Sequence, residues 1–149
     1  ILMEIAILGL GCFWGPEIKF SKLDGVIKTE VGYCGGHSAK TNYKEVCTGT
    51  TNHAEVVKLD FDPEVISYEK ILEYFFEIHD PTTLNSQGPD FGTQYRSEIF
   101  YLNNQQKNIA EKMIEQENLK LSGKVVTKTS LVKNYCPAEE YHQRYLEKR

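Results

Sequence analysis

The sequence predicts one α+β domain over residues 1–149, built as a two-layer sandwich of a sheet and its helices. A length of 149 residues suits one domain and is short for two. Segments with strand and helix patterns follow one another in the order β-α-β-β-α-β-α-β-α. The first six have the split β-α-β-β-α-β order of a ferredoxin-like core, which an extra C-terminal strand and helices are expected to extend.

The first half of the chain supplies three strands and one helix. Residues 3–9 form a short apolar run that ends in glycine, which predicts a buried strand. A helix is expected from Pro16, because proline is well tolerated in a first turn, to just before Asp24. Residues 26–33 and 54–61 have strand composition and are followed by loop residues.

The second half begins and ends with helices. Ser67 suits the N-cap of a helix over 68–79, and Asn103 with Gln106 resembles a capping box that starts another helix. The helix that starts at Asn103 is expected to end near Leu121. The remaining expected elements are strands over 94–102 and 125–131 and a short terminal helix after Pro137.

Composition and charge narrow the class of protein. The chain has 17 basic and 21 acidic side chains and a net charge of −4, which gives no electrostatic reason to expect nucleic acid or an anionic membrane as a partner. Its apolar runs fall short of the roughly 20 residues of a membrane span, and no secretory leader pattern opens the chain. We therefore expect a cytoplasmic location. The 4 cysteines are scattered and lack CxxC spacing, so we expect free thiols and neither a disulfide framework nor a zinc site.

Cys12 is the strongest candidate for a reactive residue. It lies in the segment Gly11-Cys12-Phe13-Trp14-Gly15, between the first strand and the first helix. Unpaired N–H groups and the helix dipole at such a position favour a thiolate, although a free cysteine is more often a small buried residue. Phe13 and Trp14, the only tryptophan, could line an apolar pocket for a substrate group.

Two long loops, 34–53 and 80–93, are where functional residues are expected to gather. Glu55 follows the first of them, and strand alternation puts it on the face opposite its neighbours; if enclosed, it becomes a proton donor near neutral pH. Tyr95, expected to start the fourth strand, carries a neutral hydroxyl suited to polarising an oxygen, and Asp90 lies five positions before it. For each of these residues the alternative is an ordinary surface or packing role.

The segment Gly11-Cys12-Phe13-Trp14-Gly15 resembles the active-site signature of the A-type peptide methionine sulfoxide reductases. The resemblance spans nearly the whole chain, because further motifs occur in family order and spacing. These are Val31-Gly32-Tyr33 with Gly35-Gly36, Tyr43 to Thr51, His53 to Val57, His79 to Thr83, Gly92 to Ser97, and Ala138 to Gln143.

The resemblance implies reduction of the S epimer of methionine sulfoxide, free or in proteins, to methionine. It implies that Cys12 attacks the sulfoxide sulfur and becomes a sulfenic acid, and that Glu55 donates a proton to the departing oxygen. Tyr43 and Tyr95 match the two tyrosines that hold this oxygen, while Phe13 and Trp14 match the pocket for the substrate methyl group. Asp90 matches a carboxylate that orders the site. No metal or organic cofactor is implied, and the family is usually monomeric.

Recycling of the sulfenic acid is where the sequence departs from the family. Many relatives have recycling cysteines in a glycine-rich C-terminal tail, whereas this chain ends at Arg149 without one. Cys34, expected in a glycine-flanked loop, and Cys136, before the terminal helix, are two candidate resolving residues; the alternative is that each is only a small packed side chain. The reductant is thioredoxin or another thiol. Asn52 stands where relatives often have glycine.

Two other functions fit parts of the pattern. A cysteine hydrolase or acyl-transfer enzyme would use Cys12 with His53 or His142 as its base, and it predicts a contact between cysteine and histidine. A module that binds oxidised methionine without turnover predicts that Cys12→Ser leaves its function intact.

Overall fold

The computed structural model describes residues 2–148. Its strands are β1 (Glu4–Leu10), β2 (Val26–Cys34), β3 (Ala54–Phe61), β4 (Ser86–Gln87), β5 (Asp90–Phe91), β6 (Ser97–Tyr101), β7 (Lys128–Leu131) and β8 (Cys136–Pro137). Its helices are α1 (Trp14–Ser21), α2 (Tyr43–Cys47), α3 (Tyr68–Glu77) and α4 (Asn104–Lys120), with single 3-10 turns η1 (Thr93–Tyr95) and η2 (Glu140–His142). The expected α+β class is confirmed.

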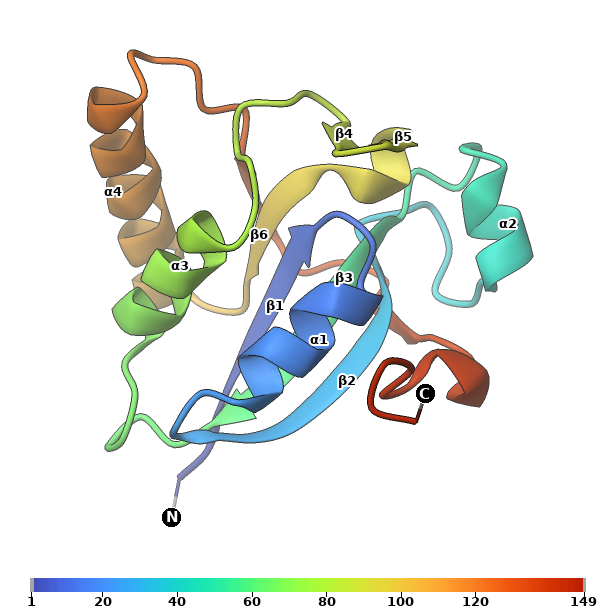
Figure 1. Ribbon diagram of the computed structural model, residues 1–149, viewed down its shortest axis with the longest axis horizontal. Helices are drawn as coiled ribbons and strands as arrows, with labels where there is room; N and C mark the ends of the chain where they lie inside the picture. The colour runs from blue at the N-terminus through green and yellow to red at the C-terminus, as the bar shows by residue number, and fades with distance from the viewer. Residues whose placement is uncertain (1, 149) are drawn as a thin grey trace.

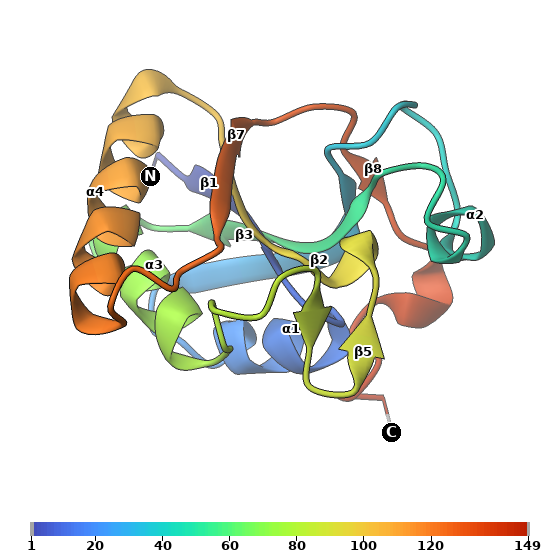
Figure 2. The ribbon, with the colours of Figure 1, turned by 90° about the horizontal axis from the view of Figure 1, so that it is seen from above.

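Six strands form one sheet in the order β7-β6-β1-β3-β2-β8. Its four inner strands are labelled in Figure 1, and the outer strands β7 and β8 in Figure 2. The central strand β1 runs antiparallel to both β3 and β6, and β2 runs antiparallel to β3. The edge strand β7 runs parallel to β6. Strands β4 and β5 form a separate small hairpin.

The helices α1, α3 and α4 cover one face of the sheet (Figure 2). On this face Leu8 and Leu59 of the sheet pack with Phe20, Phe75 and other buried apolar side chains of the helices. The opposite face has a smaller buried cluster, and the segment between β7 and β8 crosses it (Figure 2). The strands therefore alternate between two buried faces, which explains why β1 has a nearly continuous apolar sequence.

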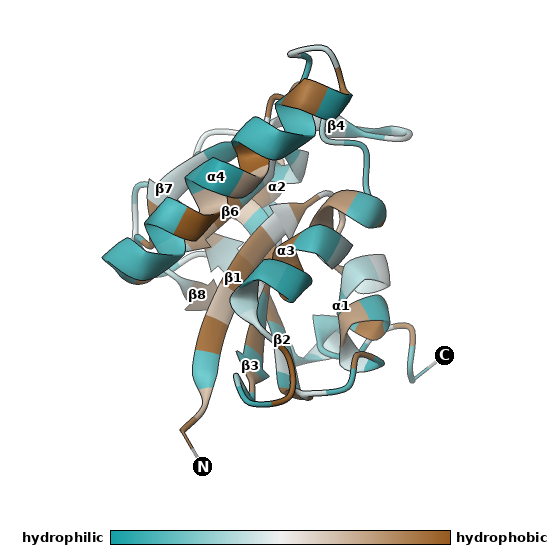
Figure 3. Cartoon of the chain, turned by 90° about the vertical axis from the view of Figure 1, so that its left-hand side faces the viewer, coloured by the Kyte–Doolittle hydropathy of each residue, from teal (hydrophilic) through white to brown (hydrophobic). Residues whose placement is uncertain are grey.

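The helix starts match local capping signals. The side chains of Ser67 and Asn103 accept hydrogen bonds from Lys70 N and Gln106 N at the first turns of α3 and α4. The Gln106 side chain accepts from Leu102 N, one residue before the N-cap, so the capping box is shifted by one position. Helix α4 exposes a largely hydrophilic surface (Figure 3), and no helix among residues 2–148 is long and apolar enough to cross a membrane.

Four sequence expectations differ from the structure. The strand expected over 94–102 is shorter, because Tyr95 belongs to the turn η1, which follows Gly92 at a φ of 133°. The strand expected over 125–131 starts only at Lys128, and the terminal helix is the single turn η2. The two long loops contain helix α2 and the β4–β5 hairpin, which lack the apolar periodicity that predicts an element.

The antiparallel order brings distant segments together at one edge of the sheet, where β1 and β2 end and β3 and β6 begin. The end of β1 lies beside the start of β6, where Leu10 pairs with Ser97. The end of β2 lies beside the start of β3, where Tyr33 pairs with Glu55. The β1–α1 connection, helix α2 and the β4–β5 hairpin gather at this edge (Figure 1), so the candidate site residues meet there.

Candidate active site

Cys12 lies in the short connection between β1 and α1, where it is half-buried. Gly11, just before it, has a φ of 98°, which favours glycine. A Cβ at Gly11 would also lie 2.8 Å from the Gln87 side chain of the β4–β5 hairpin. Glycine at this position therefore lets the hairpin pack directly against the cysteine loop.

The pKa of the Cys12 thiol is raised to about 11. Burial is the main cause, and the carboxylates of Glu55 and Asp90 raise it further, while a hydrogen bond from the backbone of Trp14 opposes them. The expectation that the start of the helix lowers the pKa of Cys12 and favours a thiolate is therefore wrong, because the net shift of this pKa is upward. The helix does supply its N–H group, but burial and two acidic neighbours outweigh it.

Glu55 is only 1 % exposed on the second position of β3. It shares the helix-covered face with Val57, whereas Ala54 and Val56 belong to the cluster on the other face, as alternation predicts. One carboxyl oxygen accepts a hydrogen bond from Phe13 N at 3.3 Å, and the other accepts from the Gln94 side chain at 3.0 Å. The first bond ties the carboxyl to the residue directly after Cys12.

Burial raises the pKa of Glu55 to about 7, although the hydrogen bonds from Gln94 and Phe13 lower it in part. Asp90, in β5, also raises this pKa by its charge. A carboxyl with this pKa carries a proton in about half of the molecules at neutral pH, so Glu55 can act as an acid there.

Two tyrosine hydroxyls lie in the same region. Tyr43 begins helix α2 and Tyr95 ends the turn η1, and each interacts with the other and with the charge of Glu55. Burial raises the pKa of both, that of Tyr95 to about 12. Both hydroxyls therefore remain neutral hydrogen-bond donors at any physiological pH.

An aromatic cluster forms the other side of the site. Phe13 is buried against Tyr33 at a ring distance of 5.8 Å. Trp14 stacks on Tyr145 at 3.9 Å, and its indole nitrogen lies 3.0 Å from Nδ1 of His142. The two residues predicted to line an apolar pocket thus lie beside Cys12 and are held by aromatic neighbours.

The two candidate resolving cysteines lie in different environments. The sequence predicts Cys34 in a loop, but the structure places it as the last residue of β2. Its side chain has 0 % exposure and donates a hydrogen bond to Lys133 O. Its side chain belongs to the cluster on the face opposite Glu55, and burial raises its pKa to about 11. Cys136 is half-buried in β8, and its sulfur lies 3.6 Å from the backbone oxygens of Thr41 and Pro137.

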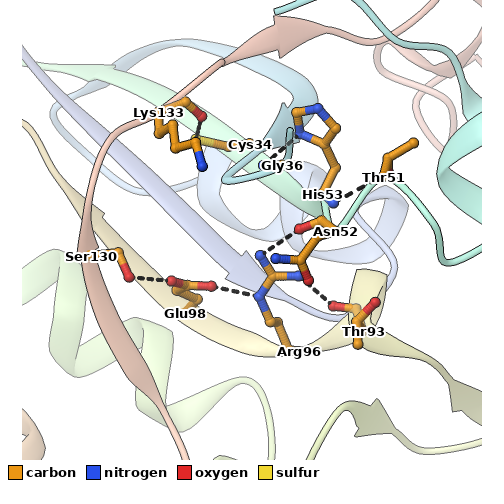
Figure 4. A network of polar contacts seen from close by, with 10 residues as sticks. All are labelled: Cys34, Gly36, Thr51, Asn52, His53, Thr93, Arg96, Glu98, Ser130 and Lys133. Atoms are coloured by element: carbon orange, nitrogen blue, oxygen red, sulfur yellow. Dashed lines mark hydrogen bonds and ion pairs between the residues drawn. The ribbon is translucent and has the colours of Figure 1, made fainter. Parts of the chain in front are cut away.

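Arg96, the residue after Tyr95, forms a buried ion pair and also bonds to the loop that precedes β3 (Figure 4). Arg96 Nε lies 2.6 Å from Glu98, whose other oxygen accepts from Ser130. The Arg96 guanidinium also donates to Thr93 O at 2.8 Å and to Asn52 O at 3.0 Å. Asn52 has a φ of 60°, a conformation that asparagine tolerates better than most side chains.

Sequence reasoning missed three contributors to the site. Gln94 was not named as a site residue, and His142 was named only as a possible base for a cysteine hydrolase, not as a partner of Trp14. Glu139 accepts from the Tyr33 hydroxyl at 2.8 Å and from Tyr43 N at 2.9 Å, so it fixes the start of α2. Gln94 directly precedes Tyr95, which could have signalled it; nothing in the spacing of Glu139 indicates its contact with a residue about one hundred positions away.

The geometry does not support the cysteine hydrolase alternative. The ring nitrogens of His53 are engaged by Gly36 N and Ser38 O (Figure 4 shows the first), and Nδ1 of His142 is engaged by Trp14. A paired imidazolium would lower the pKa of a catalytic thiol, whereas the pKa of Cys12 is raised.

Comparisons with known proteins agree with this arrangement. The family model described as peptide methionine sulfoxide reductase matches residues 4–149. The peptide methionine sulfoxide reductase MsrA of Pelagibacter ubique is 83 % identical over 147 residues, which cover 99 % of this chain and all of that protein.

Two crystal structures of Mxr1 from Saccharomyces cerevisiae are also similar. The reduced form is 42 % identical, with a TM-score of 0.93 over 99 % of this chain and 86 % of the other. A form in complex with Trx2 is 27 % identical, with a TM-score of 0.68 over 96 % and 84 % of the two chains. On the family match and on these identities, this chain belongs to the peptide methionine sulfoxide reductase family.

Proposed function

We propose that this chain reduces methionine S-sulfoxide, free or in proteins, to methionine with thiols as the source of electrons. The observation that carries the proposal is Glu55, a buried carboxyl with a pKa raised to about 7 and a hydrogen bond to the residue after Cys12. A sulfoxide oxygen leaves sulfur only when it is protonated, and this carboxyl supplies a proton near neutral pH.

In the first step the sulfur of Cys12 attacks the sulfoxide sulfur while the carboxyl of Glu55 protonates the sulfoxide oxygen. The hydroxyl then moves to Cys12, giving a sulfenic acid, while the sulfur–oxygen bond of the substrate and the sulfur–sulfur bond formed by the attack both break. Glu55 recovers the proton that the thiol loses. Methionine leaves with two electrons gained, and Cys12 is oxidised by the same two electrons.

The remaining residues bind the substrate by its two unlike groups. The hydroxyls of Tyr43 and Tyr95 donate hydrogen bonds to the sulfoxide oxygen, which suits neutral donors because this oxygen is uncharged at the start. Phe13 and Trp14 hold the methyl group on the aromatic side. The negative charge of Asp90 raises the pKa of Cys12, Glu55 and Tyr95. Asp90 therefore helps to keep all three groups protonated, on the side of the site away from Phe13 and Trp14.

In the second step two thiols reduce the sulfenic acid, giving a disulfide and water and restoring the Cys12 thiol. Thioredoxin is the proposed reductant, and the complex of Mxr1 with Trx2 supports a relative of this fold binding such a partner. Of the two candidate resolving residues, Cys136 is favoured, since it is half-buried and Cys34 lies on the other face of the sheet. Direct attack by an external thiol is the alternative.

The type of α+β core, the cellular location and the oligomeric state are also part of the proposal. The order β6-β1-β3-β2, antiparallel throughout, supports a ferredoxin-like core, with β7 and β8 as additions. A cytoplasmic monomer is proposed, in line with the four free thiols of the described residues.

The test is reduction of the separate S and R epimers of a blocked methionine sulfoxide with dithiothreitol, repeated with thioredoxin. Turnover of the S epimer alone supports the proposal. Turnover of neither epimer by the folded protein would overturn it. Thioredoxin-dependent turnover that Cys136→Ala removes, while dithiothreitol-dependent turnover persists, would identify the resolving residue.

A further inference from the structure

A buried imidazole lies directly behind the aromatic side of the site. His142, on the turn η2, is 1 % exposed, and its Nδ1 atom lies 3.0 Å from the indole nitrogen of Trp14. The chemistry proposed above gives this residue no task. Its place beside Trp14 therefore needs its own explanation.

The direction of this hydrogen bond fixes the form of the imidazole. The indole N–H can only donate, so Nδ1 of His142 must accept, and the neutral ring carries its proton on Nε2. Burial also lowers the pKa of His142, which favours the neutral ring. The buried Nε2 atom has no hydrogen-bond partner among residues 2–148. The fold thus keeps a histidine here despite an unpaired donor, which an apolar ring would avoid.

The imidazole ring also contacts both groups of proposed substrate-binding residues. Its centre lies 5.2 Å from the ring of Phe13 and 5.7 Å from that of Trp14. It lies 4.7 Å from the ring of Tyr43, one of the two tyrosines proposed to hold the oxygen. One side chain therefore supports the methyl side and the oxygen side together.

The turn that carries the imidazole is itself anchored. The side chain of Gln143 bonds to both backbone groups of Val31 in β2, at 2.9 Å each. Arg144 N donates to the buried Glu17 of α1 at 2.7 Å, and the other Glu17 oxygen accepts from Thr29. These bonds, made by the two residues directly after His142, tie the end of the η2 turn to β2 and α1 and keep the imidazole beside Trp14.

We propose that His142 is a positioning residue, which holds the indole of Trp14 in the orientation that receives the substrate methyl group. This inference rests on the proposed function for the role of Trp14, but the hydrogen bond itself can be tested without substrate. Because His142 acts through Trp14 and touches no reacting atom, its loss should weaken substrate binding more than it slows the chemical step.

Two variants of His142 separate the effect of its hydrogen bond from the effect of the size of its side chain. In His142→Asn the amide oxygen can take the position of Nδ1 and accept from the indole, whereas His142→Phe keeps a ring but offers no acceptor. We expect His142→Phe to raise KM for the S-sulfoxide about tenfold, with kcat changed less than about threefold. We expect His142→Asn to restore KM to within about threefold of the wild type.

Trp14 is the only tryptophan, so its fluorescence anisotropy reports its mobility without substrate. We expect the anisotropy to fall in His142→Phe and to return in His142→Asn. In a Trp14→Phe background, which lacks the indole donor, adding His142→Phe should raise KM much less than it does alone.

Equal damage in His142→Asn and His142→Phe, or wild-type KM and anisotropy in His142→Phe, would overturn the proposal. Circular dichroism first shows that each variant is folded. If the wild type reduces neither epimer, the proposed function fails. In that case the anisotropy comparison still tests whether the hydrogen bond from Trp14 to His142 restrains the indole. Equal anisotropy in the wild type and in His142→Phe would show that it does not and would overturn the proposal.

Discussion

The two sides of the active site are held in place by different kinds of contact. On the carboxyl side Glu55 is fixed by Gln94 and by Phe13 N, and on the other face of the sheet the buried ion pair of Arg96 with Glu98 fixes the segment that follows Tyr95. The aromatic side is held by ring contacts and by one hydrogen bond between Trp14 and His142.

This difference matches what each side is proposed to do. Burying a carboxyl without an ion pair raises its pKa, so the polar side stores a proton at the point where the oxygen leaves. A methyl group needs only shape and a dry surface, which stacked rings provide. We therefore expect changes on the carboxyl side to alter rate, pH dependence and stability, and changes on the aromatic side to alter binding.

The largest effect is expected from Glu55→Gln, which keeps the shape and one of the two hydrogen-bond acceptors but has no acidic proton to give. We expect kcat to fall by about 10²–10⁴-fold. In the wild type we expect activity to decline as pH rises through about 7, because Glu55 then loses its proton. Rates of S-sulfoxide reduction from pH 5.5 to 8.5 measure both effects.

The Glu55→Gln variant should unfold thermally near the wild-type temperature and should lose the decline in activity above neutral pH. Retention of more than about a tenth of the wild-type rate would remove Glu55 from the acid role. Wild-type activity that rises between pH 6 and 8 would contradict a protonated Glu55 as the active form.

The next effect is on stability rather than on rate. Arg96→Met leaves the carboxylate of Glu98 buried without its cation, since the side chains are only 9 % and 6 % exposed. We expect a loss of about 3–5 kcal/mol in the free energy of unfolding, measured in urea. The second change Glu98→Gln in the same chain should restore much of it, because the unpaired charge is then gone.

Arg144→Met is the matched control for Arg96→Met. Its partner Glu140 lies 3.5 Å away, and the two side chains are 46 % and 82 % exposed. We expect it to change the free energy of unfolding by less than about 1 kcal/mol. If both arginine variants lose the same stability, burial of the Arg96–Glu98 pair is not the cause of the loss.

The carboxyl side was also the less predictable of the two. Glu55 could be placed because strand alternation is local, and Phe13 and Trp14 because they directly follow the cysteine in the sequence. The contact between Arg96 and Asn52 O, by contrast, depends on how two loops close over the sheet. The pKa of Cys12 was predicted in the wrong direction because the helix start is visible in the sequence, whereas its burial is not.

A smaller effect is expected from Gln94→Leu. The Gln94 amide donates to Glu55 and lowers its pKa, so its loss should raise that pKa further. The decline in activity with rising pH should then move above its wild-type position near 7, by up to about one pH unit. The pH dependence of kcat measures this shift, and Gln116→Leu on the exposed face of α4 is the control. A move to lower pH would contradict the role of this hydrogen bond.

The smallest effect is expected from Cys34→Ala. A disulfide needs two Cα atoms within about 7 Å and side chains directed toward each other, whereas the Cys34 side chain lies on the sheet face opposite Glu55 and is completely buried. Thioredoxin-dependent turnover should therefore stay within about twofold of the wild type, while the same assay on Cys136→Ala tests the favoured resolving residue. A disulfide between Cys12 and Cys34, detected by mass spectrometry after one turnover, would contradict this prediction. It would also require β2 to open at its end, because Cys34 pairs there with Ala54 of β3.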